Sequence, residues 1–206
     1  MNRAHNFSAG PAVLPSSVIE ELSAALPNFQ NTGLGLMEMS HRSETFDAVH
    51  RSAESRLRRI LCIPDDYSVL FLQGGASLQF HMSALNLLSD GESADFVVTG
   101  TWAQKGLAEA QRIRAGRAAW DGADTRFDRL PRSLTVDENA TYLHYTTNNT
   151  IYGTQFRQPP IDTTIPLVAD MSSDICSRPV DVSQHALIYA GAQKNLGPSG
   201  VTAIIL

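Results

Sequence analysis

Four features of the sequence could do chemistry, and each stands where a predicted strand ends. Lys194 is flanked by small residues and glycines, which argues against a solvated helix face and suits a Schiff base with an aldehyde. Asp170 ends the apolar run 166–169, so its carboxylate either meets a cationic partner or caps a helix. Trp102 either stacks on a planar ligand or belongs to the core. The turn 74–77, Gly-Gly-Ala-Ser, is either an anion cradle or an ordinary turn between a strand and a helix.

Taken together, these four features match the needs of pyridoxal phosphate (PLP). The phosphate of that cofactor needs hydrogen-bond donors, and its ring needs a stacking partner. Its pyridinium nitrogen needs a carboxylate, and its aldehyde needs a lysine. Asp170 and Lys194 lie 24 residues apart, each just after a strand. The combination therefore favours PLP as the cofactor, and no residue is assigned to a metal ion.

The elements that must position these residues alternate between helix and strand. Helices are predicted at about 18–26, 44–60, 78–88 and 102–115. Strands are predicted at about 68–72, 95–99, 142–145, 166–170, 187–189 and 200–206. The run 68–72 is almost entirely apolar, which is typical of a buried parallel strand. We therefore expect an α/β domain with a mainly parallel sheet and a ligand beyond the carboxyl ends of its strands.

The 206 residues suit one large domain, or one domain and a fragment of another. The final strand has no helix after it to cover its apolar side chains. From this we expect a chain truncated at Leu206, with an open apolar surface that drives association. Such a chain would be a poor catalyst by itself.

The composition restricts the partners and the compartment. A formal net charge of −5 gives no basic field for nucleic acid or an anionic membrane. The N-terminus has no apolar signal-peptide core, and no apolar run approaches the ~20 residues of a membrane helix. Cys62 and Cys176 stand in apolar surroundings, and we expect buried, reduced thiols in a cytoplasmic protein.

Several stretches carry a resemblance to a known family. They are the segments 6–12 (Asn-Phe-Ser-Ala-Gly-Pro-Ala), 39–43, 71–80, 177–182 and 188–198, the last containing Tyr-Ala-Gly-Ala-Gln-Lys-Asn. In these the sequence resembles the phosphoserine aminotransferases, class-V members of the fold-type I PLP enzymes. The resemblance implies an α/β/α large domain with helices on both faces of the sheet. It also implies an N-terminal segment at 1–15, a PLP-binding large domain at 16–206 that is incomplete, and a missing small C-terminal domain.

The resemblance implies a role for each matching residue. Lys194 would hold the cofactor as a Schiff base and shuttle the substrate proton, and Asp170 would pair with the ring nitrogen. The other cofactor contacts would come from Ala76, Ser77 and Gln193 at the phosphate, Trp102 on the ring and Thr150 at the phenolic oxygen. His41 and Arg42 would read the acidic end of the substrate across the interface of a homodimer.

The reaction that the resemblance implies is transamination between O-phospho-L-serine and 2-oxoglutarate, which in this family serves serine biosynthesis and pyridoxine biosynthesis. One departure is Ser77, because many relatives have a basic residue there. Other reactions of the fold stay open, namely alanine–glyoxylate transamination and cysteine desulfuration, although Cys62 and Cys176 are poor candidates for a catalytic cysteine on a mobile loop. A PLP-binding fragment without catalysis is a further alternative.

Overall fold

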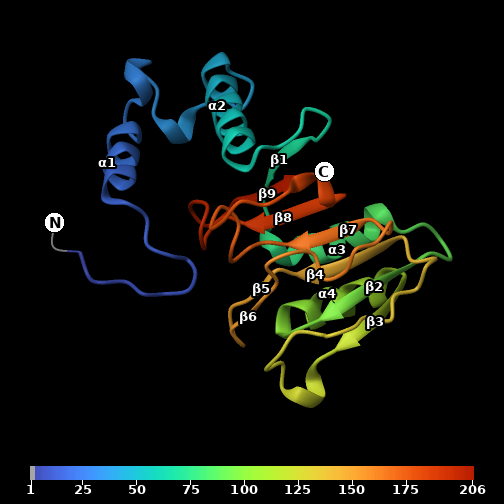
Figure 1. The fold of residues 1–206 in the computed structure, drawn as a ribbon. Helices are drawn as coiled ribbons and strands as arrows, with labels where there is room; N and C mark the ends of the chain where they lie inside the picture. The colour runs from blue at the N-terminus through green and yellow to red at the C-terminus, as the bar shows by residue number, and fades with distance from the viewer. Residues whose placement is uncertain (1–2) are drawn as a thin grey trace.

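The structure is a computed structural model and describes residues 3–206 (Figure 1). Its α-helices are α1 (Ser16–Ala25), α2 (Glu44–Leu61), α3 (Gly75–Leu87) and α4 (Thr101–Ile113). Its strands are β1 (Val69–Leu72), β2 (Ser93–Val98), β3 (Ala115–Asp121), β4 (Tyr142–Thr146), β5 (Asn148–Asn149), β6 (Thr154–Gln155), β7 (Leu167–Asp170), β8 (Leu187–Gly191) and β9 (Thr202–Ile205). The four helices lie where the sequence predicts them, whereas β3 begins where the last helix was expected to end.

Seven of the strands form one sheet in the order β1-β9-β8-β7-β4-β2-β3. The strands from β8 to β3 pair in parallel, which confirms the expected mainly parallel sheet. The prediction for β1 is wrong, because β1 is an edge strand that pairs antiparallel with β9. Leu70 of β1 is 42% exposed. An apolar run indicates that a strand is buried on both faces. It does not specify whether the strand pairs parallel or antiparallel with a partner strand more than a hundred residues later.

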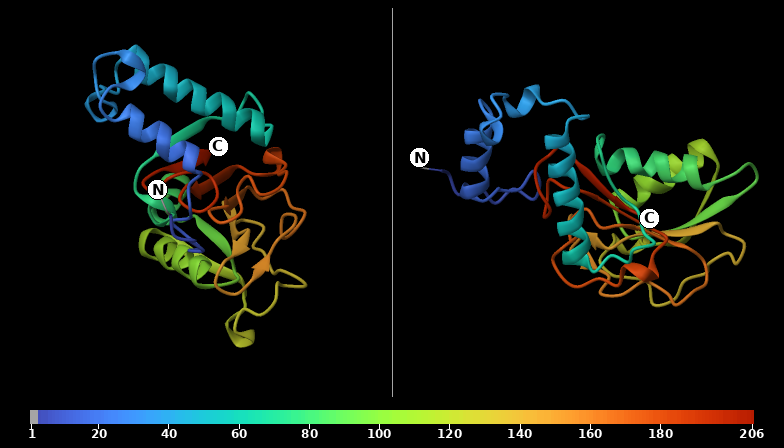
Figure 2. Two further views of the ribbon diagram at one scale, coloured as in Figure 1. Left: turned by 90° about the vertical axis from the view of Figure 1, so that its left-hand side faces the viewer. Right: turned by 90° about the horizontal axis from the view of Figure 1, so that it is seen from above.

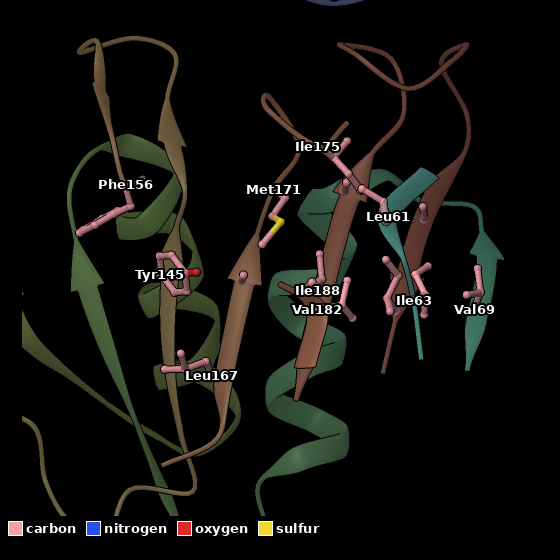
Figure 3. Packing of buried hydrophobic residues seen from close by; sticks show 14 of the residues in the cluster. Leu61, Ile63, Val69, Tyr145, Phe156, Leu167, Met171, Ile175, Val182 and Ile188 are labelled. Atoms are coloured by element: carbon pink, nitrogen blue, oxygen red, sulfur yellow. The ribbon is translucent and has the colours of Figure 1, made fainter. Parts of the chain in front are cut away.

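Helices cover both faces of this sheet, as expected for an α/β/α arrangement (Figure 2). On one face, Phe80 of α3 and Ala110 of α4 share a buried cluster with Ile204 of β9. On the other face, Leu57 and Leu61 of α2 pack in a second cluster with strand side chains and with the irregular segments after β6 and β7 (Figure 3). Neighbouring side chains of one strand therefore enter different clusters, as the period of two in a β-strand requires.

The last strand is covered, contrary to the expected open apolar surface. β9 lies between β1 and β8, and its four residues are buried. Ile205 packs in the cluster of α2, and Ile204 packs in the cluster of α3 and α4. Elements from much earlier in the sequence supply this cover, so a helix after β9 is not needed for it.

The two ends of α2 show how this helix begins and why Cys62 differs from the expectation of a buried thiol. Ser43 caps the helix, because its Oγ accepts the backbone N–H of Phe46 at 3.1 Å. At the other end, Cys62 adopts a left-handed conformation with φ 52° and its side chain is exposed. The expectation of two buried thiols is therefore wrong for Cys62, while Cys176 is partly buried.

The N-terminal segment stands apart from the sheet, together with α1 (Figure 1). α1 buries none of its residues, and its apolar residues Val18, Ile19 and Leu22 stay 37–39% exposed. The segment before α1 nevertheless contacts the body of the protein near Lys194, where the N–H of Ala12 donates to the carbonyl of Gln193 at 2.7 Å.

Candidate active site

Six of the seven predicted cofactor residues line one cavity beyond the carboxyl ends of the parallel strands, and Thr150 is the exception. The cavity is lined by Gly75, Ala76, Ser77, Phe80, Trp102, Thr146, Asn148, Asp170, Ser172, Ser173, Gln193 and Lys194. Thr146 ends β4, Asp170 ends β7, and Lys194 follows β8. Parallel strands end at the same edge of a sheet, so residues far apart in sequence become neighbours there.

The start of α3 offers unpaired backbone donors to this cavity. Gly74 precedes the helix with φ +98°, and a Cβ there would lie 2.4 Å from Leu78 Cδ2, so glycine is required. No side chain caps α3 within the described chain. The first N–H groups of the helix therefore remain free at its positive end, where Ala76 and Ser77 line the cavity.

Asp170 places a buried carboxylate in the cavity wall, with only 4% of the residue exposed. Its Oδ1 accepts the backbone N–H of Ser172 at 3.0 Å and the hydroxyl of Ser172 at 2.6 Å. Burial raises the pKa of Asp170, while the two hydrogen bonds and the charge of Lys194 act in the opposite direction. A buried carboxylate of this kind is stabilised by a cation brought into the cavity.

Lys194 follows β8 on a turn and its Nζ reaches the cavity. Nζ donates to the Oγ1 of Thr150 at 3.3 Å and lies 5.6 Å from the ring centroid of Trp102. The stem of Lys194 passes close to Gly10, where an added Cβ would lie 2.8 Å from Lys194 Cγ. In the sequence Gly10 stands out only as a member of the segment 6–12, and its contact with Lys194 is visible only in the structure.

Trp102 and Thr150 belong to two segments that are tied together. The hydroxyls of Thr101 and Tyr152 lie 3.0 Å apart. A few residues earlier in both segments, the Nδ2 of Asn149 donates to Thr99 Oγ1 at 3.0 Å. These bonds hold the loop after β4 against the start of α4. They therefore fix the position of the segment that carries Thr150 relative to the segment that carries Trp102.

The indole N–H of Trp102 is buried and finds no acceptor among residues 3–206. The Nζ of Lys105 also lies near this ring, 4.7 Å from its centroid. Lys105 is therefore a second amine close to the cavity, although it does not line it.

His41 and Arg42 are not brought to the cavity. Both are exposed and lie between η2 (Leu36–Glu38) and α2, on the segment that extends from the sheet. Neither residue is among those that line the cavity. Within one described chain the structure thus brings six of the seven predicted cofactor residues to one cavity and leaves the two predicted substrate residues outside its lining.

Several cavity residues were missed by the sequence analysis. Thr146 ends β4 and Asn148 begins β5, while Ser172 and Ser173 follow β7. Their positions at or just after strand ends were a usable signal, but serine and threonine are common in turns and their side-chain directions could not be read from the sequence. Ser172 is the most informative of them because it holds Asp170 directly.

No cluster of three or more His, Cys, Asp or Glu side chains suited to a metal ion occurs within 3–206. Across the same range, every helix is too short or too polar to cross a lipid bilayer.

Comparison with known proteins identifies related sequences. Residues 4–206 match the aminotransferase class-V family. The phosphoserine aminotransferase of Geobacillus kaustophilus is 54% identical over 208 residues, covering 100% of this chain and 58% of the relative. The chain thus spans a little under three fifths of the length of the curated relatives that it matches.

Solved structures give the same result for the fold. The phosphoserine aminotransferase of Bacillus circulans subsp. alkalophilus superposes with a TM-score of 0.94 at 49% identity, covering 99% of this chain and 57% of that one. The PLP-bound phosphoserine aminotransferase of Trichomonas vaginalis superposes with a TM-score of 0.92 at 35% identity, covering 99% of this chain and 58% of that one.

Proposed function

The chain belongs to the aminotransferase class-V family, and from this premise we propose that it binds PLP and acts in transamination between O-phospho-L-serine and 2-oxoglutarate. One observation carries the proposal: Lys194, Asp170 and Trp102 line a single cavity in a chain 54% identical to a phosphoserine aminotransferase. In this proposal residues 1–15 are an N-terminal segment, and 16–206 belong to the PLP-binding large domain.

The residues present fit PLP on chemical grounds. The uncapped start of α3 suits a phosphate, because its free N–H groups and positive end attract an anion. The buried Asp170 carboxylate suits a protonated ring nitrogen. The amine of Lys194 suits an aldehyde, and Trp102 offers an aromatic ring in the same cavity. Each part of the cofactor thus has a partner of matching chemistry.

Bound PLP would supply a ring that stabilises negative charge at the substrate Cα. Lys194 would hold the aldehyde through Nζ and, when its amine is free, would move a proton between the substrate Cα and C4′ of the cofactor. Asp170 holds the proton on the ring nitrogen by its charge. Thr150, already hydrogen-bonded to Lys194 Nζ, holds the phenolic oxygen.

The phosphate end of the cofactor is assigned to three residues of the proposal. Ala76 and Ser77 lie at the positive end of α3, and Gln193, which precedes Lys194 in the sequence, lines the same cavity. Because Ser77 is neutral, the cofactor phosphate is held here by N–H and O–H donors and by the dipole of α3.

The acidic end of the substrate is assigned to His41 and Arg42. Both residues are exposed and lie outside the cavity lining of their own chain, so we assign them to the active site of a second copy. We therefore include a homodimer, with active sites at the interface, in the proposal. A cytoplasmic location belongs to it too, supported by two cysteines that are free thiols in the structure.

Desulfuration is disfavoured by the positions of the cysteines. Neither Cys62, at the end of α2, nor Cys176 is among the residues that line the cavity. Alanine–glyoxylate transamination differs by the charge of its substrate side chain, so the role of Arg42 separates it from the proposed reaction.

The experiment that tests the proposal has two readouts. The purified protein is mixed with PLP and its absorbance recorded, and turnover is then measured with phosphoserine and 2-oxoglutarate and, separately, with alanine and glyoxylate. An imine absorbance with faster turnover of phosphoserine supports the proposal. Faster turnover of alanine indicates the other transaminase, and an imine absorbance without turnover of either pair indicates a non-catalytic PLP-binding protein.

A further inference from the structure

Ser172 makes three hydrogen bonds that together fix the direction of its hydroxyl proton. Its backbone N–H and its hydroxyl both approach Oδ1 of Asp170, at 3.0 Å and 2.6 Å. The backbone N–H of Gly191 donates to the same hydroxyl oxygen at 3.1 Å. Because an amide N–H can only donate, Gly191 occupies a lone pair of the hydroxyl. The hydroxyl proton is therefore left to point at Asp170.

This arrangement leaves the two oxygens of Asp170 unequal. Oδ1 has two donors from Ser172, whereas Oδ2 accepts no hydrogen bond from any residue of the described chain. Asp170 lines the cavity, and Oδ2 is the oxygen with acceptor capacity to spare.

We infer that Ser172 is a positioning residue, which locks Oδ1 of Asp170 so that Oδ2 meets the ring nitrogen of PLP and the carboxyl stays ionised despite its burial. The inference rests on the proposed function for the identity of the cofactor. Ser172 acts through Asp170, and its effect is therefore on the charge and orientation of that carboxylate.

The other groups near Asp170 do not replace Ser172 in stabilising the ionised carboxylate. Lys194 favours the ionised carboxylate, but its amine is assigned to the cofactor aldehyde. Asp174 is a like charge and raises the pKa of Asp170, as burial does. Tyr189, directly opposite on β8, is fully buried and neutral, since burial raises the pKa of its phenol well above the ordinary value.

The chain contains a matched control eleven residues later. The N–H and hydroxyl of Ser183 donate to Oδ1 of Asp181 at 3.1 Å and 2.6 Å, which repeats the geometry of Ser172 and Asp170. Asp181 and Ser183 are exposed and lie outside the cavity. Ser183→Ala therefore removes a serine–aspartate contact of the same geometry at an exposed position that does not line the cavity.

The first experiment uses the protein without PLP. Carboxyl ¹³C signals of labelled aspartates are titrated in the wild type and in Ser172→Ala, Ser172→Thr and Ser183→Ala, with Asp170→Asn to assign the Asp170 signal. Ser172→Ala is expected to raise the pKa of Asp170, because a donor to the charged form is lost. Ser172→Thr, which keeps the hydroxyl, restores it, and Ser183→Ala leaves it unchanged. An Asp170 titration that is the same in Ser172→Ala and wild type overturns the inference.

The second experiment measures the dissociation constant of PLP at pH 7 by fluorescence quenching. We expect roughly a tenfold loss of affinity in Ser172→Ala, from the loss of one charge-assisted hydrogen bond, with rescue in Ser172→Thr and wild-type affinity in Ser183→Ala. If Ser172→Ala does not fold, Ser172→Cys takes its place as the variant with a weak donor. Equal affinity in the wild type and the weak-donor variant contradicts the inference. Failure of the wild type to bind PLP contradicts the proposed function instead, and the titration without PLP is independent of it.

Discussion

The Nζ of Lys194 lies 3.3 Å from the Oγ1 of Thr150, although 44 residues separate them in the sequence. Lys194 follows β8 of the seven-stranded sheet and Thr150 follows β5 of the two-stranded sheet, so only the tertiary fold brings the two residues together. In the proposed function these groups serve the aldehyde and the phenolic oxygen of PLP, which are substituents of neighbouring ring carbons. Two protein groups assigned to substituents of neighbouring ring carbons thus lie within hydrogen-bond distance of each other.

Lys194→Ala should abolish the PLP adduct that borohydride reduction traps. The reason is that Nζ of Lys194 is the amine that lines the cavity. The measurement is mass spectrometry of the reduced protein and its peptides. Lys105→Ala is the matched control, since Lys105 also lies near Trp102. A label that maps to Lys105 in the wild type would show that the wrong lysine has been assigned.

Gly10→Ala should slow adduct formation without unfolding the protein. A Cβ at this position would lie 2.8 Å from Lys194 Cγ and would displace the stem of that side chain. The rate is followed by the rise of imine absorbance after PLP is added, and the fold by the melting temperature. Gly197→Ala is the control, because its Cβ would meet only Ala192 Cβ at 4.0 Å. Equal rates in both variants would argue against a tight passage at Gly10.

Asp170→Asn should preserve the fold and cripple catalysis. Asparagine has nearly the same shape and can still accept the hydrogen bonds of Ser172, but it cannot balance the charge of a protonated ring nitrogen. We expect kcat for phosphoserine to fall on the order of a thousandfold, which is about 4 kcal/mol of barrier. Circular dichroism checks the fold and steady-state kinetics check kcat. Turnover close to that of the wild type would remove Asp170 from the mechanism.

Arg42→Ala should change substrate choice and leave proton transfer intact. Arg42 is exposed, and its guanidinium makes no hydrogen bond or ion pair within residues 3–206, so stability should be unaffected. KM for phosphoserine should rise about ten- to a hundredfold, from the loss of a charged hydrogen bond, while KM for alanine stays nearly constant. The comparison of the two donors is the test, and an equal loss for both would indicate a structural role.

His144→Gln should flatten the dependence of stability on pH below neutrality. His144 is fully buried against Tyr189, with 2.7 Å between Nε2 and the phenol oxygen, and burial lowers its pKa from 6.5 to about 3. In the unfolded state His144 therefore binds a proton below pH 6.5, whereas in the folded state it binds that proton only below about pH 3. The free energy of unfolding is therefore not reduced by His144 above pH 6.5. It falls as the pH is lowered, by about 2 kcal/mol at pH 5.

Urea unfolding at pH 7 and pH 5 in both proteins measures this difference. His185, whose pKa burial also lowers, and Asp170, whose pKa burial raises, are present in both and cancel in the comparison. A loss between pH 7 and pH 5 that is as large in His144→Gln as in the wild type would assign the effect to other groups.

The sequence by itself determined the positions of the helices, most strands of the sheet and the residue types that meet at the cavity. Lys194, Asp170, Trp102 and the turn before α3 could be singled out because ligand groups of an α/β protein follow strand ends, and strand ends are marked by local changes from apolar to polar residues. These signals lie within a few residues of each other and need no knowledge of the rest of the chain.

Only the tertiary structure decided the pairing of β1 with β9 and the direction of individual side chains. The partner of Val69 is Ile205, 136 residues later, and no local pattern specifies such a contact. The same holds for Ser172, whose hydroxyl is aimed at Asp170 by an N–H from Gly191 on the neighbouring strand, and for Gly10, which makes room for Lys194. Composition and periodicity record whether a residue is buried, but long-range packing determines which group it faces.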